Sequence, residues 1–186
     1  MSLGRIGDRN ALPDIISATQ NEGSTQARVQ AILALGTLGT PENVPDAMEL
    51  QTGHRRIRQA GERALWALTD RNRMVSLIDE GLRSPTRRRR EWAAESAIIL
   101  DLPELDGWEQ ENLDDESEVV RRYAYRALGR HPSQADLPAL LTGLQDPSPE
   151  VRHEALEGTE VLHESSLEPV LHQMVQQDDN ASVRAA

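Results

Sequence analysis

The feature that most constrains the fold of this chain is a repeat of about 31 residues that runs along its whole length. Each copy is anchored by an Arg, and in every copy before the last a small residue follows three positions later. The anchors stand at positions 28, 58, 90, 121, 152 and 184, so successive copies are 30 to 32 residues apart. A fixed period of this size is typical of arrays in which each copy forms one small structural unit.

Each anchor lies in a segment whose small and apolar residues recur at helical spacing. A second small residue falls six positions after the anchor, as at Ala34, Ala64 and Ala127, and Leu follows it directly. Positions three, six and seven after the anchor share one stripe of a helix. Several copies then close on Leu-Gly, where Gly supplies the left-handed conformation that ends many helices. Each anchor segment is therefore predicted to be the second helix of a unit.

A first helix is predicted about 15 residues before the anchor in the clearest copies. Pro13, Pro45, Pro138 and Pro169 each stand near the start of a stretch with apolar residues at helical spacing. Pro is tolerated in the first turn because the N–H that it lacks has no partner in the helix there. Turn formers, such as those at 146–149, separate the first helix from the second.

Two units depart from this pattern. The third lacks the Pro and has Ser, Pro and Thr at 84–86 in place of a turn carboxylate. The fourth carries many acids over 102–118 and offers only Leu105, Trp108 and Leu113 for burial. Its first helix is predicted to be a short helix or a loop that disturbs the stack locally.

These patterns predict an all-α fold, a right-handed α-solenoid of about five to six stacked helix pairs. We expect residues 1–186 to form a single array that is truncated at both ends, because 3–7 repeat the pattern of 35–39 and the last anchor lies close to the final residue. The apolar ends of such an array favour end-to-end self-association. The expected units cover roughly 1–9 (partial), 10–40, 41–71, 72–102, 103–133, 134–164 and 165–186 (partial).

The segment 146–155 reads Asp-Pro-Ser-Pro-Glu-Val-Arg-His-Glu-Ala. This pattern resembles the short HEAT-like repeats of the phycocyanobilin-lyase type, and the likeness covers essentially the whole chain. The resemblance implies that the repeated Arg side chains are structural and form a ladder with turn carboxylates and carbonyls of their own or an adjacent unit. The residues that it assigns to this ladder are Arg28, Arg58, Arg121 and Arg152.

The composition indicates an acidic protein. The formal net charge is −11, all 20 basic residues are Arg, and Cys is absent, which excludes disulfides and thiolate metal sites. An acidic surface without Lys suits a halophile, because salt at about 1 M screens carboxylate repulsion within about 3 Å; a GC-rich genome is the alternative. With no signal pattern at the N-terminus and no run of 18 apolar residues, the chain is predicted to be cytoplasmic.

A basic island interrupts this acidic chain. Residues 54–90 hold 11 Arg and 4 acids, whereas 91–186 hold 6 Arg and 21 acids. The cluster lies at two predicted helix N-termini one unit apart, and stacking is expected to bring its Arg side chains onto one basic edge. It opposes the helix dipole there, so helix stability does not explain it. It indicates either an anionic partner or an internal counterpart for acidic loops such as 101–118. The candidate partner-binding residues are Arg55, Arg56, Arg87, Arg88 and Trp92.

No pattern of catalytic or metal-ligating residues rises above background. The five His never pair at ligand spacing, and neither a phosphate loop nor a nucleophile elbow is present. Trp66, Trp92 and Trp108 are predicted to be buried in helices rather than to stack on bases. We therefore predict no catalytic residues, no metal and no cofactor, no membrane contact, and a protein partner, which is acidic if it binds the basic island.

The leading functional hypothesis is a non-catalytic protein-interaction or scaffolding segment of a larger protein, which binds through the groove lined by the second helices or through the basic edge. The alternative is a bilin-lyase-like or nucleic-acid-processing repeat enzyme or accessory factor. Nucleic acid is the less favoured partner, because its binding weakens steeply with salt.

Overall fold

In a computed structural model of the chain, the structure describes residues 9–20, 24–50, 54–162 and 168–185. Every element of regular structure in these ranges is a helix. The chain divides within helix α5 into two compact units, residues 1–80 and 81–186, and each unit is described by itself. The α-helices are α1 (Leu12–Gln20), α2 (Thr25–Leu38), α3 (Val44–Glu49), α4 (Arg55–Leu68), α5 (Arg71–Leu82), α6 (Arg87–Leu100), α7 (Glu118–Arg130), α8 (Leu137–Gly143), α9 (Pro149–Leu162), α10 (Glu168–Gln177) and α11 (Ala181–Ala185).

The helices begin where the sequence indicates. Pro45 and Pro138 lie in the first turns of α3 and α8, and Pro13 and Pro169 are the second residues of α1 and α10. The side chain of Ser24 accepts a hydrogen bond from the N–H of Ala27 and thereby caps α2. The anchor Arg residues lie within α2, α4, α6, α7, α9 and α11, the predicted second helices.

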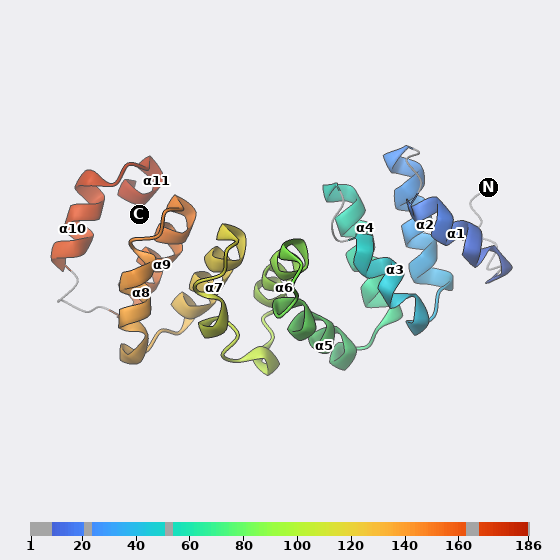
Figure 1. The fold of residues 1–186 in the computed structure, drawn as a ribbon, viewed down its shortest axis with the longest axis horizontal. Coiled ribbons are helices and arrows are strands. Elements are labelled where there is room, and N and C mark those ends of the chain that lie inside the picture. Colours follow the sequence, from blue (N-terminus) through green and yellow to red (C-terminus); the bar gives the residue numbers. More distant parts are fainter. Residues whose placement is uncertain (1–8, 21–23, 51–53, 163–167, 186) are drawn as a thin grey trace. The chain divides into compact units, whose positions relative to one another are not determined.

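In the first unit, α1 packs against α2, α3 packs against α4, and the two second helices α2 and α4 lie side by side (Figure 1). The core between them consists of aliphatic side chains such as Ile32, Leu35, Ile57 and Leu65, which are at most 1% exposed. Gly36 allows the close approach of α2 and α4, because a Cβ atom at this position would lie 2.9 Å from the Cα atom of Ala64.

In the second unit, α8 packs against α9 and α10 against α11, and the second helices α6, α7, α9 and α11 follow one another as packed neighbours (Figure 1). The core joins side chains of successive helix pairs, including Tyr125, Leu140, Val151 and Val183. Stacking of this kind buries one apolar side of each helix, as expected for repeat units that cannot fold alone. The predicted all-α solenoid of stacked helix pairs is confirmed.

The fourth repeat unit has no first α-helix. Two 3₁₀ turns, Pro103–Leu105 and Gln110–Asn112, take its place, so the predicted departure at 102–118 is a turn segment. The chain reverses there through Asp101 at φ 47° and Gly107 at φ 87°. Gly tolerates this left-handed conformation without the steric penalty that a Cβ atom incurs.

Some predictions fall on parts of the chain that are not described. The pattern at 3–7 and most of the partial unit expected at 1–9 lie outside the described residues, as do 163–167 at the start of the last unit. In the remaining ranges, α1 and α2 lie in the unit expected at 10–40, and α8 and all of α9 lie in the unit expected at 134–164. The expectation of a single array over 1–186 stays a prediction.

Candidate functional site

A ladder of guanidinium and carboxylate groups runs along one edge of the second unit. Arg90, Arg121 and Arg152 each reach forward to the Asp in the turn of the following repeat. The N–H groups of Arg121 donate to both carboxylate oxygens of Asp146, at 2.8 and 2.9 Å, and a further N–H donates to the carbonyl of Asp115 at 2.8 Å. This planar fork satisfies several acceptors at once, which an ammonium group does not do as well.

The same Asp residues link consecutive steps of this ladder. Asp146 accepts from Arg121 through its side chain and from Arg152 through its backbone carbonyl. Its carboxylate also accepts the N–H of Ser148 at 2.8 Å, which shapes the turn before α9. Asp178 repeats the arrangement with Arg152, Arg184 and Asn180.

The four Arg residues assigned to the ladder by resemblance have different surroundings. Arg121 and Arg152 make the contacts just described, and Arg28 donates from Nε to the carbonyl of Thr19 at 3.0 Å. Arg58 has an interaction whose partner is not described. Arg90 was assigned to the basic island and not to the ladder, yet it pairs with Asp115 at 2.6 Å and is 11% exposed. Its position in the repeat was the signal that could have identified it.

The candidate partner-binding residues lie at the N-termini of α4 and α6. Arg55 and Arg56 are exposed and form no ion pair with any described residue. Arg87 is exposed but donates from Nε to Glu91 at 2.7 Å, and Arg88 is exposed and has an interaction of its own. The two pairs belong to different units, so their predicted meeting on one edge stays a prediction.

The three Trp residues differ in burial. Trp92 is 7% exposed and Trp108 is 8% exposed, in line with the predicted burial, although Trp108 lies in a turn rather than in a helix. Trp66 is 38% exposed, so its ring lies partly at the surface of α4. Because Trp92 is buried within the second unit, its side chain contributes to the fold and offers little surface to a partner.

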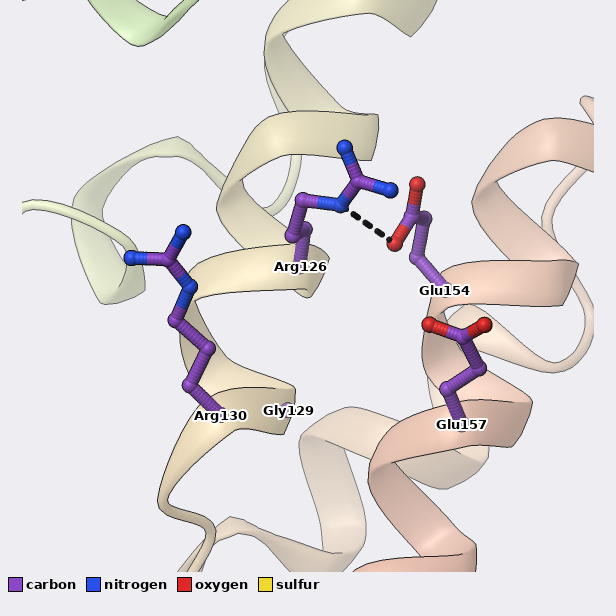
Figure 2. Close-up of a pocket in the computed structure, with 5 residues that line it drawn as sticks. All are labelled: Arg126, Gly129, Arg130, Glu154 and Glu157. Carbon is purple, nitrogen blue, oxygen red and sulfur yellow. Dashed lines mark hydrogen bonds and ion pairs between the residues drawn. The ribbon is translucent and has the colours of Figure 1, made fainter. Parts of the chain in front are cut away.

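The second helices of the second unit carry residues that the sequence analysis did not name, although it proposed the groove that these helices line. A hollow of about 220 Å³ lies between α7 and α9 and is lined by Arg126, Gly129, Arg130, Glu154 and Glu157. Figure 2 shows Arg126 of α7 facing Glu154 of α9, with Glu157 one turn further along α9. The Nε of Arg126 donates to Glu154 at 3.0 Å. Gly129 and Gly158 allow this close packing, because a Cβ atom on Gly129 would lie 3.0 Å from the Cα atom of Gly158.

Burial sets the electrostatics of this hollow. Glu154 is 7% exposed, and burial raises the pKa of its carboxyl group while the neighbouring charge of Arg126 lowers it in part. A second hollow of about 250 Å³ lies toward the N-terminal ends of α7 and α9, and its lining includes Arg122, His153 and Asn180. The Arg122 guanidinium stacks over the Tyr123 ring at 4.6 Å, and its Nε is buried without a hydrogen-bond partner among the described residues.

Basic residues on α7 are flanked by acidic or apolar residues on its neighbours. Arg122, Arg126 and Arg130 are four residues apart and therefore lie along one stripe of this helix. The residues equivalent to Arg130 in the preceding and following repeats are Ile99 on α6 and Val161 on α9. Their side chains are 62% and 53% exposed. The spacing i, i+4, i+8 within 118–130 was the signal for this stripe.

Within the described ranges, no group of three His, Asp or Glu residues is placed to hold a metal ion. Among the same residues, no helix is both long enough and apolar enough to cross a membrane.

Comparison with known proteins identifies relatives of this fold. Residues 105–186 match the family model of HEAT repeats. The chain is similar to the crystal structure of YibA of Escherichia coli, with a TM-score of 0.59 and 22% identity over 97% of this chain and 71% of that one. It also aligns with human deoxyhypusine hydroxylase in complex with glycerol, with a TM-score of 0.45 and 21% identity over 98% and 73% of the two chains. None of the curated proteins matches the sequence. At these identities the likeness to YibA shows the fold alone.

Proposed function

We propose that this chain, whose residues 105–186 match the family model of HEAT repeats, is a non-catalytic protein-binding segment that uses the face of its second helices. The fold supports a repeat protein of the scaffold type, in which stacked helix pairs present one long continuous surface. Function on such a fold depends on the site rather than on the repeat. The surface of α6, α7 and α9 is the described site that supports binding best.

The observation that carries this proposal is the exposure of aliphatic side chains on that face. Among the described residues, Ile99 and Val161 are the two aliphatic members of the exposed large hydrophobic side chains, and both lie on second helices at equivalent repeat positions. The hollow beside Gly129 lies between α7 and α9. Exposed apolar side chains that flank a charged stripe are the composition of a protein-binding surface with a hydrophobic centre and a polar rim.

The charges on this face would orient a partner. Glu95, Arg126 and Glu157 occupy equivalent repeat positions on α6, α7 and α9, so the sign alternates from helix to helix. Carboxylates of a partner would be attracted by Arg126 when they lie opposite α7, and repelled by Glu95 or Glu157 when they lie opposite α6 or α9. Such alternation fixes the register of a complex more than it raises affinity.

The test is affinity capture from a nuclease-treated lysate of the source organism, with chemical cross-linking and mass spectrometry. The double variant Ile99→Ser, Val161→Ser removes the exposed aliphatic side chains without touching the core. The charge reversal Arg55→Glu, Arg56→Glu is the matched variant for the basic edge. We expect a protein that cross-links to α7 or α9 in the wild type and is lost with the Ile99 and Val161 variant.

Two results contradict this assignment. A partner that is lost only with the Arg55 and Arg56 variant places binding on the basic edge. A partner retained by both variants refutes the second-helix face and the basic edge together.

We also propose that the acidic composition is an adaptation to high salt. The net charge of −11 comes with Arg as the only basic residue, so carboxylates dominate the surface. The partly buried ladder pairs are screened much less by salt than exposed charges are. Salt is therefore expected to relieve surface repulsion while it leaves the ladder largely intact.

A further inference from the structure

The turn segment in the fourth repeat unit opens a cleft in the second unit. A hollow of about 730 Å³ lies between the last turns of α6 and α7, and half of its lining residues come from 101–110. This segment stands where other units have a first helix. The volume falls within the range of roughly 300–1,000 Å³ that is usual for ligand-binding clefts.

The cleft has an apolar floor. Its large buried lining residues come from α6, the turn segment and α7, and each is less than a tenth exposed: Ile98, Leu102, Leu105, Trp108 and Leu128. A floor of this kind can accept an aliphatic side chain, since burial of apolar surface is favourable by about 25 cal/mol per Å².

The rim of the cleft is acidic. Asp101, Asp106, Glu109 and Asp136 line it, together with one Arg, Arg130. That Arg is already engaged, because it donates to Asp101 at 2.7 Å and to the carbonyl of Ile98 at 3.1 Å. Asp136 accepts hydrogen bonds from Gln110 and Ser133. Asp106 and Glu109 have no cationic partner among the described residues.

Two further sources of negative potential act on the same place. Helices α6 and α7 both end at the cleft, so the negative ends of their dipoles meet there. The segment 101–118 holds nine acids and no basic residue, and three of these acids form ion pairs with Arg83 or Arg90 outside the cleft. Charge, dipole and shape therefore all favour a cationic occupant with an apolar part.

We propose that this cleft binds a basic segment of a partner protein, in which Arg or Lys side chains meet Asp106 and Glu109 and an aliphatic side chain lies on the floor beside Trp108. The proposal rests on the proposed protein-binding function but places this contact in a cleft that Ile99 and Val161 do not line. It also gives the partner a chemistry opposite to that expected for the basic island.

The test measures fluorescence anisotropy of a short fluorescein-labelled peptide in which Arg alternates with Leu, in about 0.15 M KCl. The variant Asp106→Asn, Glu109→Gln removes two rim charges. The matched control Asp114→Asn, Glu118→Gln removes two exposed charges of the same acidic segment outside the cleft. We expect the rim variant to weaken binding by about tenfold or more, and the control to change it by less than about twofold.

Further ligands in the same assay distinguish the occupants that the cleft could hold. A peptide with Gly in place of Leu should bind about tenfold more weakly, since it leaves the floor empty. Equal binding by the rim variant and its control overturns the proposal, as does equal binding of the Leu and Gly peptides. Displacement of the peptide by spermidine at the same concentration indicates a small polycation instead and also overturns it.

Two measurements distinguish failure of this proposal from failure of the proposed second-helix binding face. The Ile99→Ser, Val161→Ser variant should bind the peptide as the wild type does, so failure of one surface leaves the other intact. Light scattering of the purified chain examines a second copy as the occupant. If the wild-type chain self-associates and the rim variant does not, the basic island of another copy fills the cleft. That result refutes the proposal that a separate partner protein binds there.

Discussion

Replacement of Arg152 by Ala removes one step of the ladder at a position where the guanidinium makes several hydrogen bonds at once. The Arg152 side chain is 11% exposed and that of Asp178 is 7% exposed. Two N–H groups donate to the Asp178 carboxylate, both at 2.8 Å, and another donates to the carbonyl of Asp146 at 3.0 Å. Asp179 also accepts from Arg152, but it is 90% exposed and contributes little.

The expected loss of stability follows from what the change leaves behind. Removing one partner of a buried ion pair costs roughly 3–5 kcal/mol, because the other charge remains buried without compensation. Asp178 keeps the N–H of Asn180 at 2.9 Å, and water can reach its carboxylate once the Arg side chain is gone. We therefore expect the lower end of this range, about 3 kcal/mol.

Urea unfolding followed by far-UV circular dichroism measures this loss. With a slope of about 1–3 kcal/mol per molar urea, the midpoint should fall by about 1–3 M. Arg73→Ala is the matched control, since its ion pair with Glu80 is about half exposed and should contribute less than about 1 kcal/mol. Equal midpoints for the two variants would refute the reasoning that the ladder stabilises the stack.

The same variant has a pH signature. Hydrogen bonds from Arg152 lower the pKa of Asp178 in the folded chain. A lowered folded-state pKa means that the contribution is present above the unfolded value of about 3.9 and is lost as pH falls through the folded-state pKa. The difference between wild type and Arg152→Ala should therefore shrink in acid; a difference that grows below about pH 4 contradicts the assignment.

Three other predictions concern stability. Glu154→Gln should raise the thermal unfolding midpoint at pH 8 but not at pH 4. Burial raises the pKa of Glu154, so the folded chain loses stability as pH rises through that pKa and the carboxyl group ionises. Thermal melts at both pH values check this. Gly143→Ala should cost roughly 1–3 kcal/mol in urea unfolding, since its Cβ atom would overlap the Tyr125 ring. The thermal midpoint of the wild type should rise between about 0.2 and 2 M KCl if the acidic surface is a salt adaptation, and a flat response favours the GC-rich genome.

Much of the fold could be predicted from residues that act locally. Pro138 in the first turn of α8 and the small residues after each anchor Arg mark helices by backbone and packing rules that need no tertiary information. The missing helix of the fourth unit was foreseeable for the same reason, since Gly107 and the surrounding acids leave too little apolar surface to bury.

The candidate sites were predicted less completely. Arg90 stood in a run of four Arg residues and was grouped with the basic island, although its repeat position matched that of Arg121. The stripe of Arg122, Arg126 and Arg130 was visible as helical spacing but could not be recognised as a surface until α9 was placed beside it. Trp92 entered the binding set as an aromatic near Arg residues, and burial in the second unit removed it from the surface.

The sequence by itself determined the period, the helix pairs, the acidic character and the break at 102–118, because these depend on spacing along the chain. Only the tertiary structure decided which charges are neutralised and where hollows lie. Asp115 and Asp146 are separated by one repeat in sequence, yet Arg121 joins them through its side chain. Likewise, the cleft beside Trp108 needs the ends of α6 and α7 together, and that proximity arises only when successive units stack.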